Sequence, residues 1–322
     1  MSTATILAPE QQRVLDQLSA MGGKPIESLT AAEARKQPGP TDAVHAVLTQ
    51  DGKPIRPEEV GTVRDQTIFV DGARIPIRVY TPSGTGPFPV IVYFHGGGFV
   101  IATNDTYDAS ARALTMAVGA VVVAVEYRKG PEHKFPAAHD DAFAAYVWVC
   151  KHADELRGDP TRVALAGESA GGNLAVSTAI MARERGEMMP VALLAVYPIA
   201  GTDTNTVSYR EQANAKPLNG PMMSWFFTHY LRTPADAQDA RINIVDANLS
   251  GLPPTTIIAA ESDPLRTEGE TLTSKLRAAG VSVDYRLFEG TAHEFFGQGA
   301  VQPVAMEAVA FAASALKNAL SK

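Results

Sequence analysis

The amino-acid sequence predicts an α/β fold, with a mostly parallel, eight-stranded sheet, helices on both faces and a helical cap. Three observations lead to this prediction. Short runs of β-branched and aliphatic residues alternate with helix-length segments, as in parallel sheets that are buried on both sides. A hairpin pattern precedes these runs. One interval, residues 200–248, is far longer than a crossover helix requires.

The first 65 residues lie outside this alternation. Between residues 9 and 22, apolar side chains recur at helical spacing at Val14, Leu15, Leu18 and Met21, which predicts one amphipathic helix. Residues 35–65 are rich in proline, glycine and charge, and they are predicted to form a connecting loop. The first ten residues lack the basic cluster and the long apolar run of a signal peptide, so none is expected.

The strands and helices of the main domain are predicted from residue 67 onward. The first two strands, 67–70 and 75–80, flank Asp71-Gly72, a dipeptide typical of tight hairpin turns. Five buried strands and a last strand follow, at 90–94, 121–125, 163–166, 193–197, 255–260 and 283–288. Helices are expected at 107–116, 136–151, 172–185 and about 303–320.

The long interval 200–248 contains a dense apolar helix at 222–231. Ligands of open α/β sheets bind at the carboxyl ends of the strands. We therefore expect this insertion to form a cap over that edge. Its aromatic side chains Phe226 and Trp225 are predicted to line an acyl pocket, although aromatic residues on a helix more often belong to a core.

A Gly-x-Ser-x-Gly pattern supplies the predicted nucleophile. Gly167-Glu168-Ser169-Ala170-Gly171 lies between a predicted strand and a predicted helix, the context in which a sharp turn exposes the serine. Glycines on both sides permit a strained backbone, and the helix start favours a developing negative charge. The bare pattern is weak, because glycine and serine are common, but its context predicts that Ser169 is the nucleophile.

A run of glycines supplies the predicted oxyanion donors. Gly96, Gly97 and Gly98 follow His95 directly after the buried strand 90–94, where a glycine run lets backbone N–H groups approach a ligand. Prepositioned N–H groups stabilise the oxyanion that develops in acyl transfer, so we predict Gly97, Gly98 and Ala170 as donors. A flexible loop or a phosphate-binding loop is the alternative, but the lysine-containing or dinucleotide pattern that a phosphate loop requires is missing. His95 is expected to hold the loop.

His293 is the predicted general base among the seven histidines. It follows the last predicted strand and so lies at the same sheet edge as Ser169. Asp263 follows the strand 255–260, from where its carboxylate can orient the imidazole and stabilise the imidazolium. Glu261 is the nearest rival for this role. Asp140 and Asp141 are weaker candidates, because they open a helix and suit capping.

The chain resembles the hormone-sensitive-lipase-like branch of the α/β-hydrolases, the bacterial family IV carboxylesterases, from about residue 75 to its end. The order Ser169, Asp263, His293 is the order in which that superfamily carries its triad. Several separate motifs carry the resemblance: His95-Gly96-Gly97-Gly98-Phe99, Glu126-Tyr127-Arg128, Pro131-Glu132-His133, Phe135-Pro136-Ala137-Ala138, Gly167-Glu168-Ser169-Ala170-Gly171-Gly172-Asn173, Asp263-Pro264-Leu265-Arg266 and His293-Glu294-Phe295.

The resemblance implies a division of the chain and a set of roles. Ser169, Asp263 and His293 would form the triad, with the glycine loop as oxyanion hole. Residues 1–50 and the insertion 200–248 would form the cap, whereas 51–199 and 249–322 would form one catalytic domain. A homodimer is also common in this family, and the edge strand 283–288 is one surface that can pair.

Three positions depart from the pattern of the family. Glu168 stands where aspartate is more usual, Lys129-Gly130 replaces a more usual Leu-Ala pair, and His139 stands where an apolar residue is more usual. Because none of them belongs to the predicted triad, they bear on substrate preference and pH behaviour and not on the reaction.

Composition narrows the partners and the compartment. Lys plus Arg number 28 and Asp plus Glu number 35, a net charge of −7 without a basic run, so nucleic acid is not an expected partner. The single cysteine, Cys150, excludes an intramolecular disulfide and a cysteine metal cluster. With no apolar run of about 18 residues, we expect a cytoplasmic protein without a membrane partner.

The sequence therefore predicts a serine carboxylesterase that hydrolyses small, neutral, short-to-medium-chain esters through an acyl-enzyme, with neither a metal nor an organic cofactor. A non-catalytic small-molecule receptor on the same fold is the second hypothesis, because fold alone does not fix function. An amide hydrolase with the same triad is the third, since the sequence does not separate esters from amides.

Overall fold

A single eight-stranded sheet organises the computed structural model, which describes residues 6–70 and 72–321. The strand order is β1-β2-β4-β3-β5-β6-β7-β8. The strands are β1 (Thr62–Val70), β2 (Ala73–Thr81), β3 (Phe88–Phe94), β4 (Val121–Val125), β5 (Gly158–Glu168), β6 (Leu193–Val196), β7 (Thr255–Ser262) and β8 (Val283–Ala292).

The sheet is mostly parallel, as predicted. Neighbouring strands from β4 through β3, β5, β6 and β7 to β8 pair in parallel, whereas β2 is antiparallel to both β1 and β4. The predicted hairpin is present, because β1 and β2 pair with Ile68 opposite Ile75. The turn of this hairpin was predicted at Asp71-Gly72, and Asp71 lies outside the described residues.

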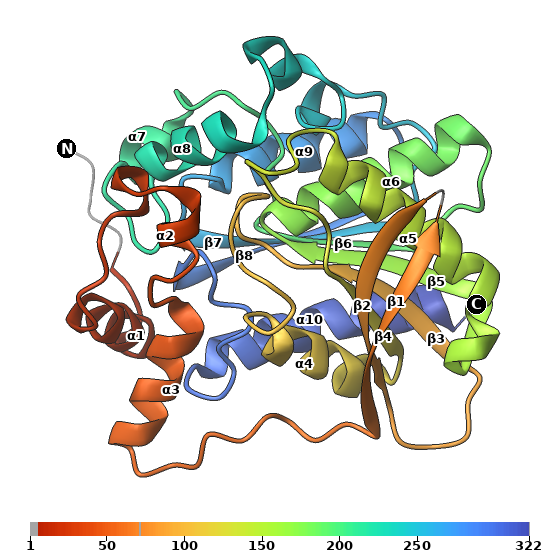
Figure 1. Cartoon of the computed structure of the whole chain (residues 1–322), viewed down its shortest axis with the longest axis horizontal. Coiled ribbons are helices and arrows are strands. Elements are labelled where there is room, and N and C mark those ends of the chain that lie inside the picture. The colour runs from red at the N-terminus through yellow and green to blue at the C-terminus, as the bar shows by residue number, and fades with distance from the viewer. Residues whose placement is uncertain (1–5, 71, 322) are drawn as a thin grey trace.

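Helices cover both faces of the sheet, which is why its strands are apolar on both sides. In β3, Val90 and Val92 pack into one cluster and Ile91 and Tyr93 into the other. The first face is covered by α5, α6 and α9 and the second by α4 and α10 (Figure 1). Their bounds are α4 (Asp108–Val118), α5 (Ala137–His152), α6 (Ala170–Arg185), α9 (Arg266–Ala278) and α10 (Pro303–Leu320), with the short η2 (Asp154–Leu156) after α5.

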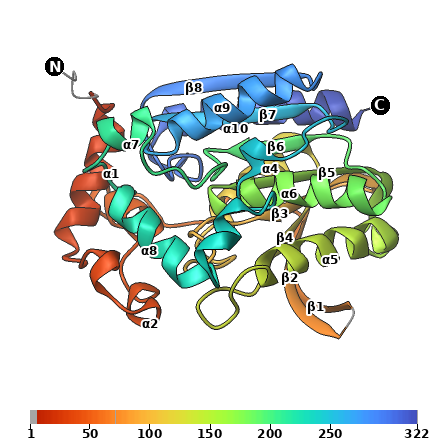
Figure 2. The ribbon, with the colours of Figure 1, turned by 90° about the horizontal axis from the view of Figure 1, so that it is seen from above.

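Among the remaining helices, α1, α2, α7 and α8 gather at the end of the sheet where the parallel strands finish, in both views of the ribbon (Figures 1 and 2). They come from two distant segments, the N-terminal one and the insertion 200–248. Trp225 joins the two, because its indole N–H donates to the Leu29 carbonyl at 3.0 Å. The helices of the two segments are α1 (Pro9–Ala20), η1 (Ile26–Ser28), α2 (Ala31–Ala34), α3 (Pro40–Gln50), α7 (Val207–Glu211), α8 (Gly220–Tyr230), η3 (Pro234–Gln238) and η4 (Ile244–Asp246).

The loop predicted over residues 35–65 is wrong in two places, because β1 already begins at Thr62 and α3 spans Pro40–Gln50. Proline at its first turn suits a helix start. Its side chains Val44, Val47 and Leu48 are buried against Val14 of α1. The glycines and prolines that suggested a loop mark the ends of this helix, and tertiary packing stabilises a segment of only 11 residues. Helix α9 was also not predicted individually.

The N-terminal segment is fixed to the end of β8. Gln11 is fully buried, and its side-chain oxygen accepts a hydrogen bond from the Ala292 N–H at 3.0 Å. The Ala8 N–H donates to the Gly290 carbonyl at 2.9 Å. Because both partners precede His293 by a few residues, α1 braces the loop that carries this histidine.

No helix within residues 6–70 and 72–321 is long and apolar enough to cross a membrane.

Candidate active site

Ser169 lies on a sharp turn between the end of β5 and the start of α6. Its φ of 56° and ψ of −116° are strained for a residue with a side chain. A Cβ atom on Gly167 would lie 2.1 Å from the Gly171 carbonyl oxygen, and one on Gly171 would lie 1.9 Å from that of Phe94. Only glycine fits both positions, which is the physical reason for the Gly-x-Ser-x-Gly pattern.

The three predicted triad residues are brought together by hydrogen bonds. His293 Nε2 lies 3.0 Å from Ser169 Oγ, and His293 Nδ1 lies 2.7 Å from Asp263 Oδ2. Asp263 is fully buried and His293 nearly so. Asp263 is itself oriented, because its other oxygen accepts the Leu265 N–H at 2.8 Å. This arrangement can move a proton from the serine hydroxyl to the imidazole.

The rival carboxylates are engaged elsewhere. Glu261 accepts the Gly290 N–H at 2.7 Å and so helps to hold the strand that leads to His293. Asp141 forms an ion pair with Arg128 at 2.7 Å, and the expectation that it caps the helix is wrong, since α5 starts behind Pro136 without a side-chain cap.

The glycine loop lies beside the serine. Gly97 and Gly98 have φ values of 94° and 58°. A Cβ atom on Gly98 would lie 2.2 Å from the Phe226 ring, so this position also requires glycine. His95 is buried and stacks on Tyr127 with ring centroids 4.3 Å apart, and the Tyr127 hydroxyl donates to the His95 carbonyl at 2.8 Å. These contacts fit the expectation that His95 holds the loop.

A cavity of about 1720 Å³ opens onto Ser169, His293 and the glycine loop. Much of its wall is apolar and comes from the two segments at the sheet edge. Phe226 is among these residues, together with Val44, Leu48, Leu218, Met222 and Met223. Trp225, which was also predicted to contact substrate, is not among the lining residues of the described chain, because its ring turns toward Leu29.

Two further carboxylates lie around His293: Glu168 is buried, whereas Glu294 keeps 19% of its side chain exposed. The sequence motifs alone do not place either of them beside the imidazole. Glu168 accepts hydrogen bonds from the hydroxyls of Tyr93, at 2.6 Å, and of Tyr197. Glu294 accepts from the Tyr107 hydroxyl at 2.6 Å, and its Oε1 lies 3.6 Å from His293 Nε2. The one signal in the sequence for their proximity to the triad is that Glu168 directly precedes Ser169 and Glu294 directly follows His293.

Burial and charge shift the pKa values at this site. Burial, with the charge of Glu294, raises the pKa of Glu168 to about 7, although its tyrosine partners act in the opposite direction. Burial also raises the pKa of Glu294. Burial alone would lower the pKa of His293, but Asp263, helped by Glu294 and Glu168, outweighs it, so the pKa lies above its usual value.

His139, one of the departures from the family pattern, is a buried link between helices. Its Nδ1 lies 2.8 Å from the Tyr230 hydroxyl and its Nε2 lies 3.0 Å from Asn173 Oδ1. Burial lowers the pKa of His139 to about 4, so it is neutral at neutral pH. It connects α5, α6 and α8 behind the serine turn.

In the part of the chain that the structure describes, no group of three or more histidine, cysteine, aspartate or glutamate side chains could hold a metal ion.

Comparison with known proteins identifies the family. A family model described as the alpha/beta hydrolase fold matches residues 91–297. The chain belongs to the α/β-hydrolase family. It is 40% identical over 265 residues to the carboxylesterase NlhH of Mycobacterium tuberculosis, covering 80% of this chain and 83% of that relative. It is 31% identical to the ethyl acetate hydrolase of Pseudomonas putida, covering 92% of both chains.

A solved structure agrees. The chain is similar to a hyperthermophilic esterase from the archaeon Pyrobaculum calidifontis, with a TM-score of 0.89, 37% identity and coverage of 97% of this chain and 98% of that one. The predicted resemblance of this α/β-hydrolase to the hormone-sensitive-lipase-like carboxylesterases is therefore confirmed.

Glu168 should make the stability of this α/β-hydrolase fall with rising pH. A carboxyl whose pKa rises from about 4.5 unfolded to about 7 folded binds its proton more tightly in the folded state. Its contribution to stability is therefore lost as the pH rises from about 4.5 through 7. Relative to the wild type, Glu168→Gln should gain about 2–3 kcal/mol of unfolding free energy between pH 5 and pH 8.

Urea unfolding at both pH values measures this change. Glu289→Gln is the matched control, because Glu289 is exposed and loses the same formal charge. If the unfolding free energies of Glu168→Gln and the wild type changed by the same amount from pH 5 to pH 8, ionisation of buried Glu168 would not destabilise the folded state.

Proposed function

We propose that Ser169, His293 and Asp263 form the catalytic triad of a serine carboxylesterase. The observation that carries the proposal is the hydrogen-bond chain Asp263–His293–Ser169, with links of 2.7 and 3.0 Å, beside a cavity whose wall is largely apolar. The two relatives described above are named as a carboxylesterase and an ethyl acetate hydrolase, and both names denote hydrolysis of carboxylic esters. A complete, oriented triad also argues against a non-catalytic receptor.

The first half of the reaction acylates the serine. His293 Nε2 takes the proton of Ser169 Oγ as the oxygen attacks the ester carbonyl carbon. The carbonyl π electrons move to its oxygen, which becomes the oxyanion of a tetrahedral intermediate. The intermediate collapses, the alcohol leaves with the proton from His293, and Asp263 stabilises the transient imidazolium through Nδ1–H.

The second half releases the acid. A water molecule gives a proton to His293 Nε2 and attacks the acyl carbon, and a second tetrahedral intermediate forms. Its collapse expels Ser169 Oγ, which recovers the proton from His293. Because the base must be neutral, the raised pKa of His293 means that activity is lost as the pH falls through a value above 6.5.

The oxyanion is proposed to bind the N–H groups of Gly97, Gly98 and Ala170. Gly97 and Gly98 line the cavity beside Ser169, and Ala170 is the first residue of the 16-residue helix α6. The unpaired N–H groups and the dipole at a helix start favour negative charge. One such donor is worth roughly 3 kcal/mol of transition-state stabilisation.

The substrates proposed are small, neutral, short-to-medium-chain esters, with Phe226 in the wall of the acyl site. Residues 1–50 and 200–248 are proposed as the cap and 51–199 and 249–322 as the catalytic domain, because both cap segments contribute to the cavity wall. A homodimer and a cytoplasmic location remain predictions from the sequence. β8 lies at the edge of the sheet, where a second strand can pair.

Ser169→Ala tests the nucleophile. Removing the hydroxyl should lower kcat for an aryl ester by about 10⁶-fold, since triad residues act as a unit. Circular dichroism should show that the variant is folded. Near-normal hydrolysis by the folded variant would contradict the assignment.

Phe226→Ala tests the acyl site. Loss of the ring beside Gly98 should admit longer chains, and each methylene that gains an apolar contact adds about 0.8 kcal/mol, or ~4-fold in kcat/KM. The ratio of kcat/KM for an octanoyl over a butanoyl aryl ester should therefore rise severalfold over that of the wild type.

Phe227→Ala is the matched control, because Phe227 is the next residue on α8 and lies outside the cavity lining of the described chain. The octanoyl-to-butanoyl ratio of kcat/KM in Phe227→Ala should remain that of the wild type. An unchanged ratio in Phe226→Ala, or a shift only in a series that varies the alcohol, would overturn the acyl-site assignment.

A further inference from the structure

The loop that follows the two oxyanion glycines is strained. Phe99 and Ala102 have φ values of 62° and 66°, in the left-handed region that side chains disfavour. Such a backbone conformation is unfavourable and persists only where its surroundings hold it. The position of the Gly97 and Gly98 N–H groups therefore depends on contacts from outside the loop.

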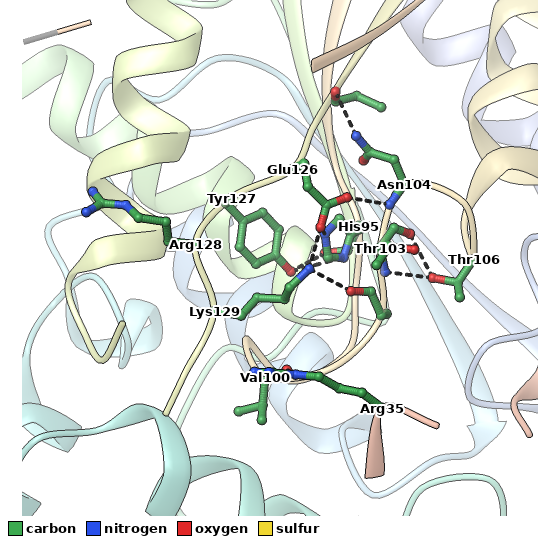
Figure 3. A network of polar contacts seen from close by, with 12 residues as sticks. Arg35, His95, Val100, Thr103, Asn104, Thr106, Glu126, Tyr127, Arg128 and Lys129 are labelled. Atoms are coloured by element: carbon green, nitrogen blue, oxygen red, sulfur yellow. Dashed lines mark hydrogen bonds and ion pairs between the residues drawn. The ribbon is translucent and has the colours of Figure 1, made fainter. Parts of the chain in front are cut away.

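Three carbonyl groups of this loop are bound by residues from elsewhere. The Phe99 carbonyl accepts the Gly130 N–H at 2.9 Å. The Val100 carbonyl accepts Arg35 Nε at 2.9 Å, and the Ala102 carbonyl accepts Lys129 Nζ at 2.8 Å. Figure 3 shows Arg35 beside Val100 on one side of this network and Lys129 beside Glu126 on the other.

Lys129 and Gly130, which depart from the family pattern, belong to this support. Lys129 forms an ion pair with Glu126, which also accepts the Asn104 N–H at 2.8 Å. Burial alone would raise the pKa of Glu126, but His95 and Lys129 lower it to about 2, so Glu126 is charged at neutral pH. A Cβ atom on Gly130 would lie 2.7 Å from the His229 carbonyl oxygen, so the end of α8 requires glycine here.

Arg35 differs from the other supports because it comes from the N-terminal segment, directly after α2. Its guanidinium binds the Gly130 carbonyl at 2.6 Å in addition to Val100. Both oxygens of Glu132 accept from it, at 2.8 and 2.7 Å. This paired contact fixes the guanidinium plane, so that Nε faces the Val100 carbonyl. One side chain thus connects the N-terminal segment with the oxyanion loop and with the loop that carries Lys129.

We propose that Arg35 is a positioning residue for the oxyanion hole. By binding the Val100 and Gly130 carbonyls, it holds the strained loop in the conformation that directs the Gly97 and Gly98 N–H groups at the reacting carbonyl oxygen. The proposal rests on the proposed esterase function, and it makes the reaction depend on the docking of the N-terminal segment.

The proposal predicts a particular kinetic defect. Oxyanion donors act mainly when charge develops in the transition state, so a displaced loop should lower kcat and leave KM nearly unchanged. A small misplacement of catalytic groups can cost ~100-fold. Arg35→Ala should therefore lower kcat by about 10- to 100-fold. Arg35→Lys should recover only part, because lysine lacks the planar fork that binds Glu132 and two carbonyls together.

A trifluoromethyl ketone inhibitor supplies a readout that a general loss of stability would not move. Ser169 Oγ adds to its carbonyl carbon, the serine proton passes to His293, and the carbonyl oxygen becomes an oxyanion in the proposed hole. The Ki of this inhibitor should rise by the same factor as kcat/KM falls in Arg35→Ala. Arg13→Ala is the matched control, because Arg13 pairs with Asp51 in the same N-terminal segment. In Arg13→Ala, both kcat/KM and the Ki of the inhibitor should stay within about 2-fold of the wild-type values, as expected for an exposed ion pair.

The outcomes separate this proposal from the proposed function. Unchanged kcat/KM and Ki in Arg35→Ala would overturn the positioning role, as would a lower kcat/KM with an unchanged Ki. If Arg35→Ala does not fold, Glu132→Gln keeps the arginine but weakens its orientation. Its kcat/KM should fall by a smaller factor than expected for Arg35→Ala, and its Ki should rise by that same factor. Hydrolysis that persists in Ser169→Ala would instead refute the proposed function itself.

Discussion

The close contact between the start of α6 and the end of β3 constrains the rest of this active site. A Cβ atom on Gly171 would lie only 1.9 Å from the Phe94 carbonyl oxygen, so the helix begins directly against the strand. This contact forces the turn that gives Ser169 its left-handed backbone. It also brings the helix start next to the glycine loop, since this loop follows Phe94. The nucleophile and the proposed oxyanion donors are thus positioned by one backbone packing.

The other groups reach this turn from separate parts of the chain. His293 and Asp263 follow the two last strands of the parallel sheet, whose register brings their carboxyl ends together. Gln11 braces the histidine loop and Arg35 the glycine loop, so the N-terminal segment contacts both sides of the reacting centre. Buried carboxylates raise the pKa of His293, and the strain and charge of the site are tolerated because a two-sided core surrounds them.

Much of this could be predicted from the sequence, because the relevant signals are local. The buried strands, the Gly-x-Ser-x-Gly turn and the positions of Asp263 and His293 after strand ends all follow from short patterns. Helix α3 was missed, since its stability comes from packing on α1 and its ends resemble loop sequence. Arg35 was missed because the two backbone carbonyls that it binds lie 65 and 95 residues away, and backbone carbonyls leave no mark on the sequence. Trp225 was misplaced because the apolar run of α8 does not say which ring faces the cavity.

The central claim is that Ser169 attacks a carbonyl whose oxygen binds the glycine loop and the start of α6. The most direct measurement is a crystal structure of the chain after reaction with a serine-directed aryl phosphonate, a stable analogue of the tetrahedral intermediate. The account predicts phosphorus bonded to Ser169 Oγ and its oxygen at hydrogen-bond distance from the N–H groups of Gly97, Gly98 and Ala170. Phosphorus on another residue, or an oxygen directed away from these groups, would contradict it.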